Sequence, residues 1–85
     1  MIVESSSAVI EKNTIFENLK ANIALGGYNS QNTLIVENRI FGSRCEGIFM
    51  IDACECLILR NEIYGNNDGI ITITSVPQIE NNKIY

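Results

Sequence analysis

Two acidic side chains and one arginine are the residues of this chain whose types and spacing could support chemistry. Glu46 and Asp68 each precede a glycine that opens an apolar stretch. If these stretches are equivalent strands of neighbouring repeats, the two carboxylates lie about 5 Å apart, the separation of paired strands. Two carboxylates at that distance could share a proton, hold calcium or act in glycoside hydrolysis, and Arg44 could serve as the base.

The simpler interpretation is that these three residues are solvated loop side chains. Acidic residues are common in loops before glycine, and the chain has only two aspartates, Asp52 and Asp68, so no third carboxylate joins the pair. We therefore predict no catalytic residue, with Glu46, Asp68 and Arg44 as the only candidates should that prediction fail. We also predict no metal site and no cofactor.

The cysteines and the absence of histidine further limit the types of reaction and metal site that the chain could support. Cys54 and Cys56 form a Cys-x-Cys pair, which we interpret as small buried turn residues rather than as a metal or redox motif. With Cys45 they make three cysteines, an odd number without disulfide-framework spacing, which favours reduced thiols in an intracellular, cytoplasmic protein over a secreted one. The chain contains no His, which excludes a His-dependent hydrolase and a His-ligated metal.

Charge and hydropathy exclude two classes of partner. The net charge is −4, whereas a nucleic-acid surface needs clustered Lys and Arg. No apolar run reaches the ~20 residues of a membrane-spanning helix. Hydrophobic residues make up 46% of the 85-residue chain and Ile is frequent, which favours an all-β fold. We expect neither a nucleic-acid nor a membrane partner.

A repeated phrase, Ile-x-x-Asn-x-Ile followed by an aromatic residue, must position all of these side chains. It occurs four times, around Asn13, Asn38, Asn61 and Asn82. The asparagines are 25, 23 and 21 residues apart. Self-similarity at such a period indicates a solenoid, in which each repeat buries its apolar face only against its neighbours.

Each repeat is predicted to be a coil of three short strands and three bends. The first strand begins at Asn22, Gly47 or Gly69, the second lies around Ile35, Ile58 or Ile79, and the third follows the Asn bend. Stacked coils would place Asn13, Asn38, Asn61 and Asn82 in an amide ladder, where Asn accepts a left-handed bend and its amide both donates and accepts. Charges of alternating sign beside each Asn predict outward ion pairs of Glu37 with Lys12 and Arg60, and of Glu62 with Arg39 and Lys83.

The full pattern, best seen from Gly69 to Ile84, resembles the right-handed parallel β-helix repeats of the pectin-lyase-like superfamily. It is most similar to the carbohydrate-binding and sugar-hydrolase repeats found in F-box substrate receptors. The resemblance implies about three and a half coils of 21–25 residues. It does not fix an activity, because the superfamily includes lyases, hydrolases, epimerases and non-catalytic binders. A leucine-rich repeat is the structural alternative, but Ala8, Thr33, Cys56 and Pro77 stand where that family has Leu.

The resemblance makes the Gly-Ile strands and the loops before them the ligand-facing side. Their outward positions would be Ala24, Phe49 and Ile71, unless the alternation slips by one residue and turns Ile71 and Ile73 inward. We expect a non-catalytic recognition or scaffold module that binds a protein or a glycan there. The alternatives are part of a carbohydrate-active enzyme, such as a polysaccharide lyase or hydrolase, and a purely structural stacking unit.

The two ends of the repeat array carry no capping element. Met1 to Ser6 aligns with Ile70 to Ser75, the end of a first strand, and Tyr85 lies in a third strand. Uncapped terminal strands are unpaired edges. We therefore expect residues 1–85 to form a single repeat domain that is a fragment or an uncapped unit, and that can self-associate end to end.

Overall fold

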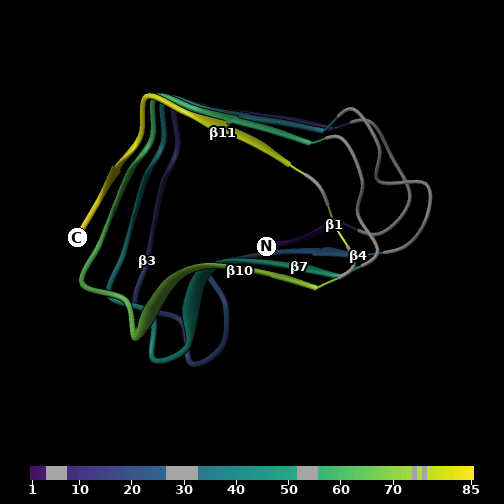
Figure 1. Cartoon of the computed structure of the whole chain (residues 1–85). Coiled ribbons are helices and arrows are strands. Elements are labelled where there is room, and N and C mark those ends of the chain that lie inside the picture. Colours follow the sequence, from purple (N-terminus) through teal and green to yellow (C-terminus); the bar gives the residue numbers. More distant parts are fainter. Residues whose placement is uncertain (4–7, 27–32, 52–55, 74, 76) are drawn as a thin grey trace.

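The computed structural model describes residues 1–3, 8–26, 33–51, 56–73, 75 and 77–85. These residues form twelve β-strands in three four-stranded sheets, and every strand pair is parallel. Viewed along the solenoid in Figure 1, each coil is an open loop with one sheet on each of three sides. The predicted all-β parallel solenoid is confirmed. Asp52 and Cys54 lie outside the described residues.

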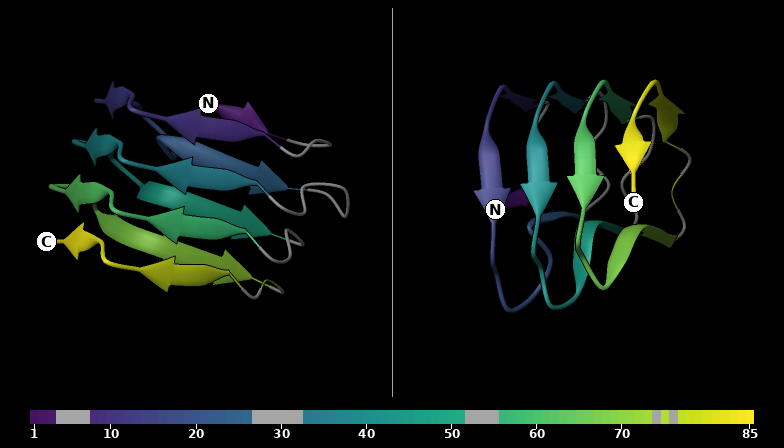
Figure 2. Two further views of the ribbon diagram at one scale, coloured as in Figure 1. Left: turned by 90° about the horizontal axis from the view of Figure 1, so that it is seen from above. Right: turned by 90° about the vertical axis from the view of Figure 1, so that its left-hand side faces the viewer.

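Each coil contributes one strand to each sheet. Sheet A contains β1 (Ile2–Val3), β4 (Ile23–Gly26), β7 (Glu46–Ile51) and β10 (Asp68–Ile73). Sheet B contains β2 (Val9–Glu11), β5 (Leu34–Val36), β8 (Leu57–Leu59) and β11 (Gln78–Glu80). Sheet C contains β3 (Thr14–Phe16), β6 (Arg39–Phe41), β9 (Glu62–Tyr64) and β12 (Lys83–Ile84). Figure 2 shows the coils stacked in chain order, with the first and last coils at opposite ends of the stack.

The strand register places equivalent isoleucines of successive repeats directly above one another. In sheet B, Ile35 pairs with Ile10 and with Ile58. In sheet C, Ile40 pairs with Ile15 and with Ile63. Paired residues of parallel strands point to the same face, so these columns fill the interior. The central members Ile35, Ile40, Ile58 and Ile63 are fully buried, as are Ile23 and Ile48, which pair in sheet A.

Left-handed residues make the bends on both sides of sheet C. Before sheet C, φ lies between 54° and 57° at Lys12, Glu37, Arg60 and Asn81. After sheet C, φ is 55° at Glu17, 72° at Gly42 and 62° at Gly65. The expectation that the repeat Asn itself is left-handed was wrong. The preceding residue takes that conformation with its side chain in solvent, which leaves the Asn side chain free to point inward.

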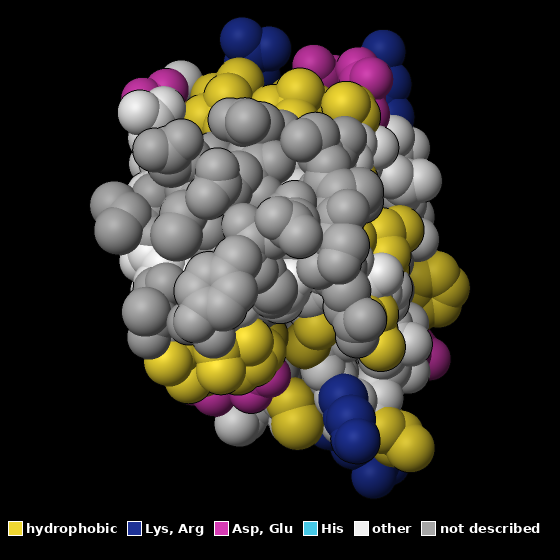
Figure 3. Space-filling model, turned by 90° about the vertical axis from the view of Figure 1, so that its right-hand side faces the viewer, with side chains coloured by type: hydrophobic (Ala, Val, Ile, Leu, Met, Phe, Trp, Pro, Cys, Tyr) yellow, Lys and Arg dark blue, Asp and Glu magenta, His cyan; other side chains and the backbone are white. Residues whose placement is uncertain are grey.

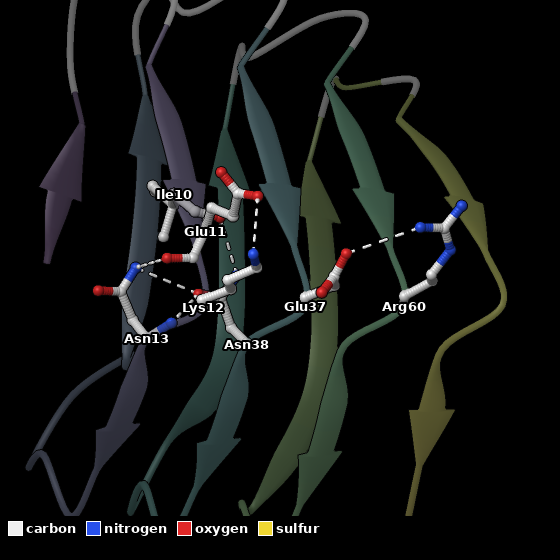
Figure 4. A network of polar contacts seen from close by, with 7 residues as sticks. All are labelled: Ile10, Glu11, Lys12, Asn13, Glu37, Asn38 and Arg60. Carbon is white, nitrogen blue, oxygen red and sulfur yellow. Dashed lines mark hydrogen bonds and ion pairs between the residues drawn. The ribbon is translucent and has the colours of Figure 1, made fainter.

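The side chains of the four repeat asparagines bond to one another along the solenoid. The Nδ2 atom donates to Oδ1 of the next asparagine at 3.2 Å for Asn13, 2.9 Å for Asn38 and 3.0 Å for Asn61. The backbone N–H of each also donates to that same oxygen, at 2.9, 2.9 and 2.8 Å. Figure 4 shows the first of these steps, between Asn13 and Asn38. We call this series the asparagine ladder.

The ladder also ties each bend to the coil before it. Nδ2 of Asn38 donates to the carbonyl of Ile10 at 2.9 Å, and Nδ2 of Asn61 donates to that of Ile35 at 2.9 Å. Asn38 and Asn61 are only 1% and 3% exposed. Among the described residues no buried side-chain nitrogen or oxygen lacks a partner, so the interior asparagines are accommodated without a desolvation penalty.

Two of the four predicted charge pairs are present. Arg60 lies 3.7 Å from Glu37, and Arg39 lies 3.4 Å from Glu62. The predicted Lys12–Glu37 pair is absent, because Lys12 instead contacts Glu11 of its own coil at 4.0 Å (Figure 4). The Glu62–Lys83 pair is absent as well. All three observed pairs are exposed, so they contribute little to stability and mainly record the register.

Replacing Asn61 by Leu should lower the free energy of unfolding by about 3 kcal/mol, because the buried N–H and Nδ2 of Asn38 lose their shared acceptor. Asn67→Leu is the matched control, since Asn67 is exposed and its side chain makes one long bond to Asp68. Urea denaturation measures both. Equal stability of the two variants would contradict the structural role of the ladder.

Gly47 is required by close packing between coils. A Cβ there would lie 2.8 Å from the carbonyl oxygen of Gly69 and 2.8 Å from Cγ2 of Ile63. We expect Gly47→Ala to destabilise the fold by about 2 kcal/mol through overpacking. Gly26→Ala is the control, because its Cβ would meet Ile51 only at 3.7 Å, an ordinary contact. Thermal unfolding of the two variants checks this, and a similar loss in both would refute the packing argument.

Candidate functional site

The outer side of sheet A carries the predicted binding positions in one column. Ala24 pairs with Phe49, and Phe49 pairs with Ile71. Phe49 lies between the fully buried Ile48 and Met50, so its side chain is on the outer side of the strand. All three column members are half-buried. Because Ile71 shares the register of Phe49, the alternative slip that would turn Ile71 inward does not occur.

A second apolar column lies beside the first. Ile51 pairs with Ile73, and the two side chains are 40% and 46% exposed. Ile2, which pairs with Ala24, extends the first column and is 74% exposed. These residues form what we call the apolar face: Ile2, Phe49, Ile51, Ile71 and Ile73. Contiguous exposed apolar side chains on a sheet are the usual mark of an interaction surface.

The two candidate carboxylates lie at the start of the same strands. Glu46 and Asp68 are paired in the register, Glu46 half-buried and Asp68 exposed. Arg44 is exposed, and in the described part of the chain no ion pair joins it to either acid. Nor do the described residues contain a group of three His, Cys, Asp or Glu that could hold a metal ion. The pair therefore places adjacent negative charge at the start of the strands that carry the apolar face.

A second buried polar network lies at the corner between sheets C and A, and sequence reasoning missed it. Nδ2 of Asn22 donates to Oδ1 of Asn66 at 3.1 Å, and Asn66 accepts from the backbone N–H of Ser43 at 2.9 Å. Asn18 donates to Oδ1 of Asn22 at 2.6 Å. The Ser43 hydroxyl donates to the carbonyl of Lys20. This network fixes the corner from which the strands of the apolar face begin.

Sheet C carries a column of stacked aromatic rings on its outer side. The ring centroids are 5.1 Å apart for Phe16 and Phe41, 4.9 Å for Phe41 and Tyr64, and 5.3 Å for Tyr64 and Tyr85. The interplanar angles are 6°, 9° and 12°, so the rings face one another and present their edges outward. The sequence signal for this column is the aromatic residue that ends each repeat phrase.

A chain of polar contacts lies beside these rings. Arg39 donates to the Tyr64 hydroxyl at 2.9 Å and lies 5.8 Å from the centre of the Phe41 ring. The Tyr85 hydroxyl donates to Glu62 at 2.9 Å. The hydrogen bond to Tyr64 raises the pKa of Arg39, and the hydrogen bond to Glu62 raises the pKa of Tyr85. Arg39 is thus paired with Tyr64, and Glu62 with Tyr85, on this side.

A family comparison agrees with this geometry. The model of a right-handed β-helix region matches residues 1–84 of the chain. The chain belongs to the right-handed β-helix family. Comparison with curated proteins and with solved structures gave no match. The β-helix assignment thus rests on the family match, the repeat and the three parallel sheets. It does not distinguish a binding role from a catalytic one, which must be argued from the side chains on the surface.

On the side seen in Figure 3, the charged side chains are dispersed. Lys and Arg lie at the upper and lower ends, and Asp and Glu lie at the upper end and also in the lower half. The described residues include no helix long and apolar enough to cross a membrane.

The β-helix should lose stability in alkali through Tyr85. The folded pKa of Tyr85 lies above its ordinary value of 10.0, so this contribution is complete below pH 10.0 and is lost as the pH rises through the folded pKa. Tyr85→Phe removes that dependence. Urea midpoints of both chains at about pH 9 and about pH 11 test it, since Tyr ionises between them. Parallel decreases in the two chains would contradict the Tyr85–Glu62 bond.

Proposed function

We propose that this chain is a non-catalytic recognition module that binds a protein partner on the apolar face of sheet A. The observation that carries the proposal is the presence of two adjacent apolar columns, in register, on the outer side of one sheet. Ile2, Ile51 and Ile73 are between 40% and 74% exposed there. An outer side with apolar columns in register suits a complementary apolar segment.

The charge beside the face indicates the partner's chemistry. Glu46 and Asp68 stand three residues before Phe49 and Ile71, which is about 10 Å along a strand. Neither acid has an ion-pair partner among the described residues. A partner segment with apolar side chains and a Lys or Arg about 10 Å away would match both features.

A glycan is the less favoured ligand on this face. Sugar recognition needs directed hydrogen-bonding groups around an aromatic platform, and the apolar face has one aromatic residue, Phe49, among isoleucines. On sheet C the aromatic rings stack on each other, so both faces of Phe41 and Tyr64 are occupied by neighbouring rings. These features support a protein ligand over the carbohydrate alternatives, including the enzymatic one.

Selection of peptides from a random displayed library tests the proposal. We expect enriched peptides that combine aliphatic or aromatic residues with Lys or Arg, and we expect Phe49→Asp to weaken their binding about tenfold or more. Val9→Asp is the matched control, because Val9 is 64% exposed on a strand of sheet B, away from the face.

Three other results would each contradict the proposal in a different way. Peptide binding that Val9→Asp and Phe49→Asp weaken equally would contradict the assignment of the face. Glycan-array binding that Phe49→Asp abolishes, without any peptide enrichment, would establish the glycan alternative. Calcium-dependent cleavage of a polyuronate that Asp68→Asn abolishes would establish the enzymatic one.

A further inference from the structure

The outer side of sheet A carries large side chains on one strand and small ones on the strand beside it. On β7 the outward residues include Phe49 and Ile51, and their register partners on β4 are Ala24 and Gly26. The outward side chains of β7 therefore project further from the sheet than those of β4. A second surface of the same shape fits only where its large side chains lie over the small ones of the first.

A twofold axis creates this match. An axis parallel to the strands, midway between β4 and β7, places β4 of a second copy over β7 and β7 of that copy over β4. Phe49 then meets Ala24 of the second copy, and Ile51 meets Gly26 of the second copy. Each contact occurs twice, because a twofold interface uses the same surface of both copies. The two sheets would lie about 10 Å apart, the usual distance between stacked sheets.

The charges at the start of these strands are complementary in the same arrangement. Ile23 pairs with Ile48, and continuing this register back by two residues sets Glu46 beside Ala21. The twofold axis therefore brings Glu46 over Ala21 of the second copy, next to Lys20 of that copy. Lys20 is exposed, and neither Lys20 nor Glu46 has an ion-pair partner among the described residues. Opposite charges across a contact favour the arrangement that brings them together.

We propose that the protein partner of the apolar face is a second copy of this chain, in a twofold dimer with β4 of each copy packed on β7 of the other. This inference rests on the proposed function and names its partner. A second copy supplies both features that the face requires, because it has apolar columns and a basic residue, Lys20, four residues before Ala24. The contact is centred between β4 and β7, so it does not depend on where the solenoid begins or ends.

The dimer is expected to be weak. The apolar face has few residues beside the roughly 20–30 residues that each partner contributes to a standard interface. Phe49 and Ile71 are already half-buried within the chain, which reduces the area that association removes from water. We expect a dissociation constant on the order of 0.1 mM. Because a twofold contact is closed, assembly should stop at two copies.

Sedimentation over a concentration series up to about 1 mM tests the dimer. We expect the mass to rise from one chain to two and then to stay constant. Ala24→Phe should weaken dimerisation about tenfold or more, because it sets a second ring against Phe49 of the other copy. The face stays apolar in this variant, so we expect it to retain binding of the peptides selected from the library. Circular dichroism confirms that each variant is folded.

Val9→Phe is the matched control for Ala24→Phe. It adds the same side chain on an outward strand position of sheet B, where Val9 is 64% exposed. We expect this variant to dimerise as the unmodified chain does.

Mixing two weakened variants tests the register of the contact. Phe49→Ala should weaken dimerisation about tenfold, because it removes the ring that packs over Ala24 of the other copy. In a mixture of Ala24→Phe chains and Phe49→Ala chains, every ring at these positions meets an alanine of the other chain. We expect the mixture to recover most of the association that each variant loses alone. Recovery by mixing requires that the two positions meet between chains, not only within one.

The results that overturn the dimer differ from those that overturn the proposed function. A chain that stays monomeric throughout the series, while selected peptides still bind it in a Phe49-dependent way, contradicts the dimer and leaves the proposed function standing. A mass that rises beyond two copies contradicts a closed twofold contact. A mixture that associates no better than its components contradicts the packing of β4 on β7. A Phe49-dependent dimer of a chain that selects no peptide would support the dimer and leave a second copy as the partner of the face.

Discussion

The hydrogen bonds of the asparagine ladder are the interaction on which the rest of the structure depends. A buried amide must be paired, and here each is paired with the equivalent residue of the next coil. A slip of one residue in any coil would leave both an Oδ1 atom and a backbone N–H unsatisfied in the interior. The isoleucine columns oppose the same slip, because it would turn their side chains outward, but their apolar contacts are not directional and set no hydrogen-bonding geometry. The ladder thus converts a repeated sequence into a unique register.

The strand register determines which side chains lie together on the outer side of each sheet. On sheet C it brings Arg39 to Glu62 and Tyr64 and stacks the aromatic rings, so these polar side chains have partners within the chain. On sheet A it aligns the half-buried Phe49 and Ile71, and it aligns the exposed Ile51 and Ile73. The same constraint that builds the solenoid therefore gives sheet C paired polar side chains and sheet A an apolar outer side. That contrast is the physical basis for assigning recognition to sheet A.

The repeat made the architecture predictable from the sequence. The Ile-x-x-Asn-x-Ile phrase, its period and the strand starts at Gly47 and Gly69 predicted three strands per coil and gave Phe49 and Ile71 equivalent positions. The preference of Asn for left-handed backbone did not predict which residue forms the bend. The Asn side chain points inward, and the residue before it, such as Glu37, takes the left-handed conformation. The pairing of Lys12 with Glu11 was missed because long exposed side chains have several partners of similar energy. The corner network was missed although Asn18, Ser43 and Asn66 each follow a ladder asparagine by five residues. The residue type changes to Ser in the second of these positions, and Asn22 lies outside them, so the pattern is less uniform than that of the ladder.

The central claim, that the ladder holds the register, is tested most directly by amide hydrogen exchange of the dilute chain measured by nuclear magnetic resonance. The account predicts that the backbone N–H groups of Asn38 and Asn61, which donate to buried side-chain oxygens, exchange as slowly as those of the central strands. The N–H of Asn82, which has no described acceptor, should exchange rapidly. Rapid exchange at Asn38 and Asn61, matching that at Asn82, would contradict the account.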